Sequence, residues 1–303
     1  MKKFLFVFLT VAFLFSCSDD DAEQTGNSIV DIASGDAQFS TLVSALDRTG
    51  LVPTLAGEGS FTVFAPTDAA FNALGVDLNT LTDAQLTDIL LYHVVGSEIA
   101  SSAIGEGQTY VSSASTSAPN GGALSLLVEK AGTGVTINNA AEVVSADIQA
   151  SNGVIHVIDQ VLLPLDVVGH ASANSNFTSL VGALAAAPGD LVSVLSGDGP
   201  FTVFAPLNSA FEAIADVAAT LTGDQLASVL TYHVVSGNVM STELSNGMTA
   251  PTVNGEMIEF NISGGNVSVI DANGNASNVV LTDVQATNGV IHVIDSVILP
   301  ENL

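Results

Sequence analysis

Basic residues, cysteine and tryptophan are almost absent from this 303-residue sequence. Four Lys and Arg residues stand against 31 Asp and Glu, which gives a formal net charge of −27 at neutral pH. Nucleic-acid-binding surfaces neutralise phosphates with clustered Lys and Arg, so the composition argues against nucleic acid as a partner. Charged residues make up only 12% of the chain, about half the usual ~25%, so the acidity comes mainly from missing bases.

The N-terminal segment has the pattern of an export signal. Lys2 and Lys3 precede an apolar run over residues 4–15, which is 12 residues long. A helix needs about 20 residues to cross a bilayer, so this run is too short to span one. The pattern predicts a secretory signal peptide over residues 1–16.

Cys17, the only cysteine, follows this segment directly and has no partner for an internal disulfide. With Leu14 and Ser16 before it, Cys17 resembles the lipobox of bacterial lipoproteins, in which the cysteine is lipidated and becomes the first mature residue. The resemblance implies lipid attachment at Cys17 and a bacterial cell-envelope location, with exposure on the outer membrane expected because an acidic stretch follows. Residues 17–27 are expected to form an acidic tether. The alternative is a cleaved signal peptide whose cysteine has no role.

The rest of the chain consists of two sequence repeats of one domain. Three boxes return in the same order. They are Phe61–Phe71 and Phe201–Phe211, Tyr92–Val95 and Tyr232–Val235, and Asn152–Asp159 and Asn288–Asp295. The repeat is about 140 residues long, far longer than the roughly 20–50 residues of a solenoid repeat. Each copy is therefore expected to have its own hydrophobic core. We place the first domain at residues 28–166 and the second at residues 167–303.

The first half of each copy predicts helices. Apolar residues recur at i, i+3, i+4 and i+7, which places them on one face of a helix. They are Phe39, Leu42, Val43 and Leu46 in the first copy and Phe177, Leu180, Val181 and Leu184 in the second. A short helix is expected with Asp68, or Asn208 in the second copy, as its N-cap. Another begins with a Thr-x-x-Gln capping box at Thr82–Gln85, and again at Thr222–Gln225.

The second half of each copy predicts strands. In the first copy, β-rich runs lie around Tyr110 and at 124–128, 135–137, 142–146, 154–158 and 161–164. A further buried strand at 61–65 is expected to find its partners at the far end of its copy. Helices followed by antiparallel strands define an α+β fold class.

The three boxes resemble those of the fasciclin domain family, with a strand of type F-T-V-F-A-P, a central Tyr-His pair and a terminal N-G-x-I-H-x-I-D. Both copies carry all three, over roughly residues 28–303. The resemblance implies tandem domains, each with helices packed on two short, steeply crossed β-sheets, in which the first and last boxes pair. It also implies extracellular work, such as cell adhesion, matrix contact and, for bacterial members, surface attachment or host association.

The same resemblance gives candidate adhesion residues, because some animal members are reported to bind integrins through an Asp-Ile pair and the Tyr-His box. The candidates are Asp88, Ile89, Tyr92, His93, Tyr232 and His233. The second copy lacks the Asp-Ile pair and has Ser228 and Val229 in its place. The competing interpretation is structural, because Ile89 and His93 fall on the inward face of a capped helix.

Repeat-matched histidines raise the possibility of a metal site, but each copy offers only two and no cysteine or H-E-x-x-H pattern accompanies them. His156 and His292 sit in apolar strands, where we expect structural, buried and hydrogen-bonded imidazoles. His170 replaces Ile32 of the first copy and is a candidate for the interface between the copies. Residues 271–275 hint at a calcium loop, but the spacing fits a hairpin turn better, which leaves only weak Ca²⁺ association open.

No G-x-S-x-G nucleophile and no nucleotide-binding glycine motif occurs, so neither enzyme activity, a cofactor nor a specific metal site is expected. The leading hypothesis is a non-catalytic, lipid-anchored adhesion protein for cell-surface, matrix or biofilm attachment. Its partners are an extracellular polymer, matrix or cell-surface ligand, and the membrane through Cys17. The alternative is a glycan-capture accessory lipoprotein for nutrient uptake, although the chain has no Trp and only three Tyr for a sugar platform. The identity of the ligand, the domain that binds it and the oligomeric state stay open.

Overall fold

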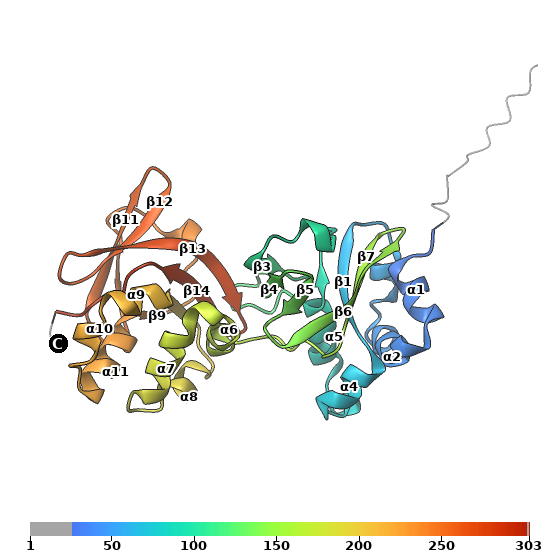
Figure 1. Ribbon diagram of the computed structural model, residues 1–303, viewed down its shortest axis with the longest axis horizontal. Helices are drawn as coiled ribbons and strands as arrows, with labels where there is room; N and C mark the ends of the chain where they lie inside the picture. The colour runs from blue at the N-terminus through green and yellow to red at the C-terminus, as the bar shows by residue number, and fades with distance from the viewer. Residues whose placement is uncertain (1–25, 302) are drawn as a thin grey trace, which may run out of the picture.

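The computed structural model describes residues 26–301 and residue 303. The predicted signal peptide, Cys17 and the tether up to residue 25 lie outside the described residues. Figure 1 shows two lobes side by side, one for each sequence copy, with α1 at one end of an elongated molecule and the C-terminus at the other. Within the described part, no helix is both long and apolar enough to cross a membrane.

The first domain is a helical segment followed by a meandering sheet. Its helices are α1 (Ile29–Gly35), η1 (Ala37–Phe39), α2 (Ser40–Thr49), α3 (Val52–Ala56), α4 (Asp68–Leu74), η2 (Leu78–Thr80), α5 (Asp83–Tyr92) and η3 (Ser101–Ala103). Its strands are β1 (Phe61–Pro66), β2 (Val94–Val95), β3 (Gly107–Ser112), β4 (Ser125–Ala131), β5 (Gly134–Ile137), β6 (Ala141–Ala150) and β7 (Gly153–Ile158). The predicted run at 161–164 forms no strand.

The second domain repeats this plan, with the short α-helix α10 in the place of η2. Its helices are α6 (Val167–Ala173), η4 (Ser175–Phe177), α7 (Thr178–Ala186), α8 (Leu191–Leu195), α9 (Asn208–Ala213), α10 (Ala215–Ala218), α11 (Gly223–Tyr232) and η5 (Ser241–Glu243). Its strands are β8 (Phe201–Pro206), β9 (Val234–Ser236), β10 (Thr249–Pro251), β11 (Met257–Ser263), β12 (Asn266–Ile270), β13 (Ala276–Ala286) and β14 (Gly289–Ile294). The turn between β12 and β13 contains the predicted Asn273–Gly274 hairpin.

Each domain has one seven-stranded sheet, in the order β2-β1-β7-β6-β5-β4-β3 in the first domain and β10-β11-β12-β13-β14-β8-β9 in the second. The long strand β6 has two register shifts and pairs with both β5 and β7, so it joins the two crossed halves that the family resemblance implied. A bridge between Val95 and Ser113 brings the two ends of the first sheet together. The sheet is therefore nearly closed, and the α+β class is confirmed.

The first and last boxes of each domain pair directly, as expected. β1 and β7 are parallel neighbours, with Phe61 opposite Gly153 and Pro66 opposite Ile158. A Cβ atom at Gly153 would overlap the carbonyl oxygen of Phe61, and Gly289 is equally close to Phe201 in the second domain. Only glycine permits this approach of two backbones, which explains its place in both boxes.

Two apolar clusters fill the first domain, and three fill the second. In the first domain, one cluster lies between the helices and the sheet and includes Phe39, Leu42 and Leu90. The other lies inside the folded sheet and includes Phe64 and Tyr92. The predicted apolar helix stripe thus contributes to the first cluster and the box strand β1 contributes to both.

The helix caps agree with the sequence at one site and differ at another. Both Thr-x-x-Gln capping boxes are present at the starts of α5 and α11. The prediction of Asp68 as the N-cap of α4 is wrong by one residue, since Thr67 holds that position and accepts a bond from the Ala70 N–H at 3.2 Å. In the second domain Leu207 occupies the N-cap position of α9 and makes no side-chain cap.

Asp68 and Asn208 cap a different helix from the one predicted. The Asp68 carboxylate accepts bonds from the Thr41 N–H at 2.8 Å and the Ser40 hydroxyl at 2.5 Å, at the first turn of α2. Asn208 accepts from the Ser179 N–H of α7 at 2.9 Å in the same way. The first turns of α2 and α7 offer free N–H groups that these side chains reach across the fold.

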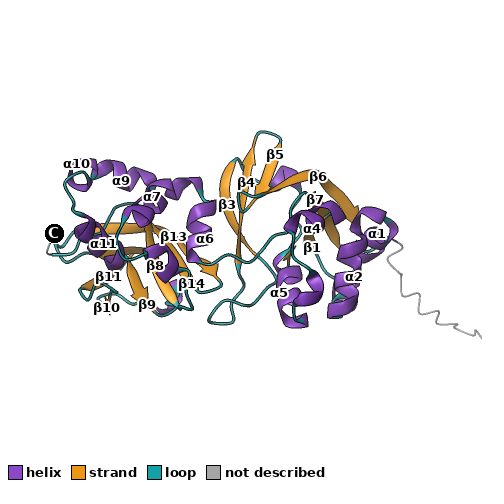
Figure 2. Ribbon diagram, turned by 90° about the horizontal axis from the view of Figure 1, so that it is seen from below, coloured by secondary structure: helices purple, strands orange, loops and turns teal. Residues whose placement is uncertain are grey.

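The two domains touch through β3 and β4 of the first domain and η4, α6 and β13 of the second. Figure 2 shows β3, β4, α6 and β13 at the junction. Gln108 donates to the Ser175 hydroxyl at 3.0 Å and accepts from Asn176 at 2.8 Å. The Gln285 N–H donates to the Ser125 hydroxyl at 2.9 Å. The domains are therefore joined by hydrogen bonds as well as by the short segment of chain that connects them.

His170 lies in this interface. It is fully buried, and its ring centroid is 5.9 Å from that of Tyr110 in the first domain. Tyr110 also accepts a hydrogen bond from Asn174 at 3.1 Å. The unmatched histidine of the second copy is therefore part of the contact between the domains.

Replacing Asp68 with Ala should lower the free energy of unfolding by about 1 kcal/mol, because two groups of the first turn of α2 lose their acceptor. Asp68→Asn should retain most of the stability, since Asn208 already does the same work in the second domain. Denaturant unfolding measures the change, and Asn208→Ala is the matched variant. Equal stability of wild type and Asp68→Ala would contradict the cap assigned here.

The effect of Asp68→Ala should also depend on pH. Hydrogen bonds from Ser40 and then from Thr41 lower the pKa of Asp68 below its usual 3.8. The carboxylate therefore stabilises the fold fully above pH 3.8, and its contribution is lost as the pH falls through the lower folded value.

Candidate functional site

The Tyr-His boxes lie where α5 and α11 end against the sheet. Tyr92 is completely buried, and its hydroxyl donates to the Ser125 carbonyl and accepts from the Asn138 amide, both at 2.9 Å. Tyr232 is equally buried, and its hydroxyl donates to Met257 O and accepts from the Ala272 N–H. Burial raises the pKa of Tyr92 and raises that of Tyr232 to about 12. Both tyrosines connect a helix end to the interior of the sheet.

His93 closes the C-terminal end of α5. Its Nδ1–H donates to the Ile89 carbonyl at 2.7 Å, and its Nε2 accepts from the Leu162 N–H at 2.9 Å. These bonds require a neutral imidazole with the proton on Nδ1. Burial lowers the pKa of His93 to about 4, against the opposing effect of the Ile89 bond.

His233 makes the same contacts in the second domain, with Val229 O at 2.8 Å and the Ile298 N–H at 3.2 Å. Burial lowers its pKa to about 4 as well. In each domain the histidine thus links a helix to the segment that follows the last strand.

His156 and His292 hold a second, different set of groups. The Nδ1 atom of His156 accepts from the Asp147 N–H at 3.2 Å, and its Nε2–H donates to the Ile99 carbonyl at 2.8 Å. Its ring stacks on Phe64, with 5.7 Å between centroids. His292 contacts the corresponding groups of Asp283, Val239 and Phe204.

Every ring nitrogen of these four histidines therefore has a partner within its own domain. Metal binding at any of them would first require one of these hydrogen bonds to break. Among the residues that the structure describes, no three His, Cys, Asp or Glu side chains gather where they could hold a metal ion.

Asp88 and Ile89 are the candidates whose side chains are partly exposed. The Asp88 carboxylate accepts a bond from the Ser115 hydroxyl at 3.1 Å. Tyr92 and His93, which follow on the same helix, are 0% and 2% exposed, and Tyr232 and His233 are buried too. A ligand could therefore reach the Asp88–Ile89 pair directly, but could reach the four Tyr-His residues only after local opening. Ligand binding by any of the six stays a prediction.

Sequence reasoning missed the role of the Asn that begins each last box. Asn152 is buried, accepts from the Ile29 N–H at 2.9 Å and donates to the carbonyls of Leu55 and Gly57, both at 2.8 Å. Asn288 makes the same three bonds in the second domain. The repeat of Asn-Gly in both boxes was the available signal, but nothing in the sequence shows which backbone groups the amide reaches.

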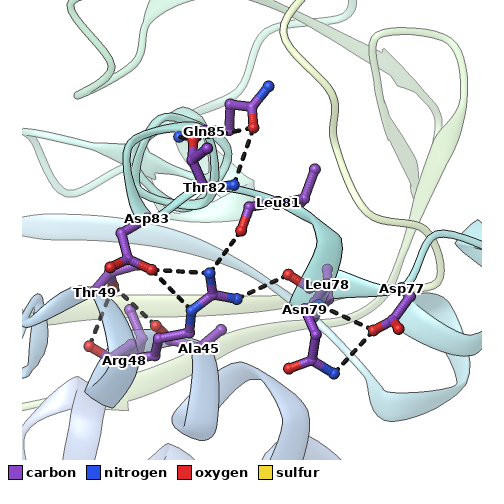
Figure 3. Close-up of polar contacts among 11 residues, drawn as sticks. Ala45, Arg48, Thr49, Asp77, Leu78, Asn79, Leu81, Thr82, Asp83 and Gln85 are labelled. Atoms are coloured by element: carbon purple, nitrogen blue, oxygen red, sulfur yellow. Dashed lines mark hydrogen bonds and ion pairs between the residues drawn. The ribbon is translucent and has the colours of Figure 1, made fainter.

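The two basic residues of the described chain both donate hydrogen bonds to backbone carbonyls of loops. Arg48 donates to Asp83 Oδ1 at 2.9 Å and to the carbonyls of Leu78 and Leu81 at 2.8 and 2.6 Å, as Figure 3 shows. It lies at the edge of a surface hollow of about 340 Å³ beside α2. Lys130 donates to the carbonyls at positions 101 and 104. Neither cation is free to form an anion-binding stripe.

Comparison with known proteins establishes the family. The fasciclin domain model matches residues 37–164 and 175–300, and the chain belongs to the fasciclin family. The FAS1 domain pair of the insect cell adhesion molecule fasciclin I has a similar fold, with a TM-score of 0.53 and 20% identity over 87% of this chain and 97% of that one.

Several relatives share more sequence. The chain is 31% identical over 266 residues to transforming growth factor-beta-induced protein ig-h3 of Sus scrofa and 30% identical over 265 residues to human periostin. Each match covers 84% of this chain but only 37% and 30% of those proteins, respectively, so this chain spans about a third of their length. It is also 44% identical over 141 residues to Protein sll1483 of Synechocystis, covering 45% of this chain and 74% of that protein.

His93→Ala should lower the free energy of unfolding by roughly 2–3 kcal/mol at pH 7.5, because the buried Leu162 N–H loses its acceptor and a cavity remains. Asp88→Ala, at a partly exposed position of the same helix, is the control and should change stability by less than about 1 kcal/mol. Denaturant unfolding of both variants measures this. An unfolding free energy of His93→Ala equal to that of the wild type would refute the structural role of this histidine.

Stability of the wild type should fall as the pH drops from 6.5 to about 4. Burial lowers the pKa of His93, His170 and His233 to about 4, whereas unfolded histidines titrate near 6.5. The unfolded chain therefore binds more protons in this window, and the stabilisation present above pH 6.5 is lost on the way down. The loss of unfolding free energy caused by His93→Ala should become smaller over the same pH range. Denaturant unfolding of wild type and variant at pH 7.5, 5.5 and 4.5 measures this change.

Proposed function

We propose that this protein is a non-catalytic, lipid-anchored adhesion protein of the bacterial cell surface. The observation that carries the proposal is the pair of fasciclin domains, each complete in its three boxes. The solved structure of similar fold comes from an insect cell adhesion molecule, which supports a general adhesion role. Cell-surface, matrix or biofilm polymers are the proposed ligands.

The state of the histidines supports a binding role over a catalytic one. A general base needs a ring nitrogen that can reach a substrate proton. In the four repeat-matched histidines both nitrogens already bond backbone groups, as in His93 and His156. Their arrangement serves the fold of each domain.

The contact between the domains supports attachment through both at once. Bonds such as Gln285 to Ser125 and Gln108 to Ser175 hold the lobes together. Two linked sites of moderate affinity bind a repetitive polymer with greater avidity than either site alone, provided that the polymer spans both. A surface polymer is such a ligand.

The anchor is tested by Cys17→Ala. Lipidation with several acyl chains would hold the protein on the membrane, and without Cys17 no acceptor thiol remains in the chain. We expect the wild type in the membrane fraction and the variant in the soluble or secreted fraction, measured by immunoblot. A variant that stays with the membrane would contradict the lipid anchor.

Attachment is tested by deleting the gene and restoring it with variants. Deletion should lower attachment of cells to a surface or biofilm several-fold, and the wild-type gene should restore it. Asp88→Ala should restore it only in part if the partly exposed Asp88–Ile89 pair contacts the ligand. Ser228→Ala, the matched position of the second domain, should restore it fully.

Thermal melts of both variants separate lost contact from lost fold. Unchanged attachment after deletion would count against the adhesion role itself. Full restoration by Asp88→Ala would instead remove Asp88 from the proposed site and leave the role standing.

A further inference from the structure

His170, the histidine without a counterpart in the first copy, is buried at the contact between the domains and lacks the hydrogen bonds that the other four histidines make. It lies in α6 and is 0% exposed. Among the residues that the structure describes, neither of its ring nitrogens has a partner of good hydrogen-bond geometry. A buried polar group without a partner destabilises the state that buries it. His170 therefore does not support the fold as His93 and His156 do.

The matched positions of the first domain show what buries this histidine. Ile32 of α1 stands at the equivalent position and is only partly buried. Asp36 and Gln149 are exposed. Their counterparts Asn174 and Gln285 are only 5% and 4% exposed, because this end of the second domain lies against β3 and β4. Separation of the two domains would therefore return water to the histidine.

The groups that meet across the contact beside His170 are neutral. The Tyr110 ring lies 5.9 Å from the imidazole, centroid to centroid, and its hydroxyl accepts from Asn174 at 3.1 Å. Burial raises the pKa of Tyr110, so this residue stays uncharged at acidic pH. The Gln285 N–H donates to the Ser125 hydroxyl at 2.9 Å. None of these groups supplies a negative charge to a protonated ring.

The charged side chains around this contact have partners of their own. Asp166 caps the start of α6, and Glu129 of β4 accepts from Gln108 at 3.0 Å. Lys130, next on β4, donates to the carbonyls at positions 101 and 104. Burial lowers the pKa of His170 to about 4, against the opposing effects of Asp166 and of a nearby backbone group. The attraction of Asp166 thus does not offset the loss of hydration.

Protonation of His170 favours the separated domains. A charged imidazolium in the closed contact would lose its hydration without a bonded carboxylate in return. In the separated state the ring regains water and its ordinary pKa of about 6.5. Between pH 6.5 and 4 the separated state therefore binds more protons than the closed one. The stability of the contact is fully present above pH 6.5 and is lost as the pH falls through this window.

We propose that His170 makes the contact between the two domains sensitive to pH, and that its protonation at mildly acidic pH releases the second domain from β3 and β4 while each domain stays folded. Opening the contact breaks a small set of bonds between the domains, whereas unfolding a domain exposes its apolar core, so the contact opens first. The proposal concerns this contact alone and does not depend on the adhesion role.

Hydrogen exchange of the Gln285 amide in the purified protein tests the proposal, because its partner Ser125 belongs to the other domain. The exchange rate, measured by NMR and corrected for the intrinsic rate at each pH, gives the equilibrium constant for opening. We expect this constant to rise roughly 30-fold between pH 7.5 and 5.0, from a pKa of about 4 in the closed contact and about 6.5 after separation.

A second amide separates opening of the contact from unfolding of the domain. The Phe204 N–H donates to the His233 carbonyl at 2.9 Å inside the second domain and should stay more strongly protected than the Gln285 N–H at both pH values. Equal protection of the two amides would mean that Gln285 exchanges only when the whole domain unfolds, which would overturn the proposal.

Variants assign the response to the histidine. His170→Ile copies the first domain, and His170→Gln keeps a polar side chain that does not titrate, so the test stands even where one of them folds poorly. Both should remove most of the 30-fold change. Ile32→His, at the matched position outside the contact, is the control and should leave the response of the Gln285 amide intact. A response that is absent from the wild type, or that persists in both His170 variants, would refute the proposal.

Discussion

The parallel pairing of β1 with β7 is the interaction on which the rest of each domain depends. It joins a strand from the helical half to the last strand of the same copy, with six consecutive residue pairs in register. The contact at Gly153 brings the two backbones so close that no side chain fits. Once this pair has formed, the strands between its partners must fold back, which gives the nearly closed sheet.

Neutral, buried side chains then fasten the helices to this pair. Asn152 sits directly before β7 and bonds the start of α1 and the end of α3. His93 bonds the segment after β7, and His156, within β7, bonds the loop after β2. The bonds of the buried His93 are strong only while its imidazole stays neutral, and burial lowers the pKa of that ring, so the fold loses stability at mildly acidic pH.

Much of this architecture could be predicted from the sequence, because local patterns determine it. The capping boxes at Thr82 and Thr222 depend on residues three apart, and the apolar stripe of α2 on one helix face. The cap formed by Asp68 could not be predicted, because its acceptor role is across the fold and the adjacent Thr67 serves the local one. Local propensity identifies a capping residue, but only the tertiary structure shows which helix it caps.

The candidate sites were harder to predict for the same reason. The Tyr-His boxes stand out in the sequence because they repeat, yet the structure buries them, and repetition here marks groups that each domain needs in order to fold.

The comparison of the two copies separates what the fold requires from what it tolerates. Asn152 and Asn288 bond equivalent backbone groups, and both copies keep them. Asp88 and Ser228 occupy matched positions of α5 and α11 but differ in chemistry. Because the same fold forms with either residue, the carboxylate of Asp88 is not a requirement of the common scaffold. Asp88 is also partly exposed, so it remains the predicted binding residue that a ligand could reach without local opening.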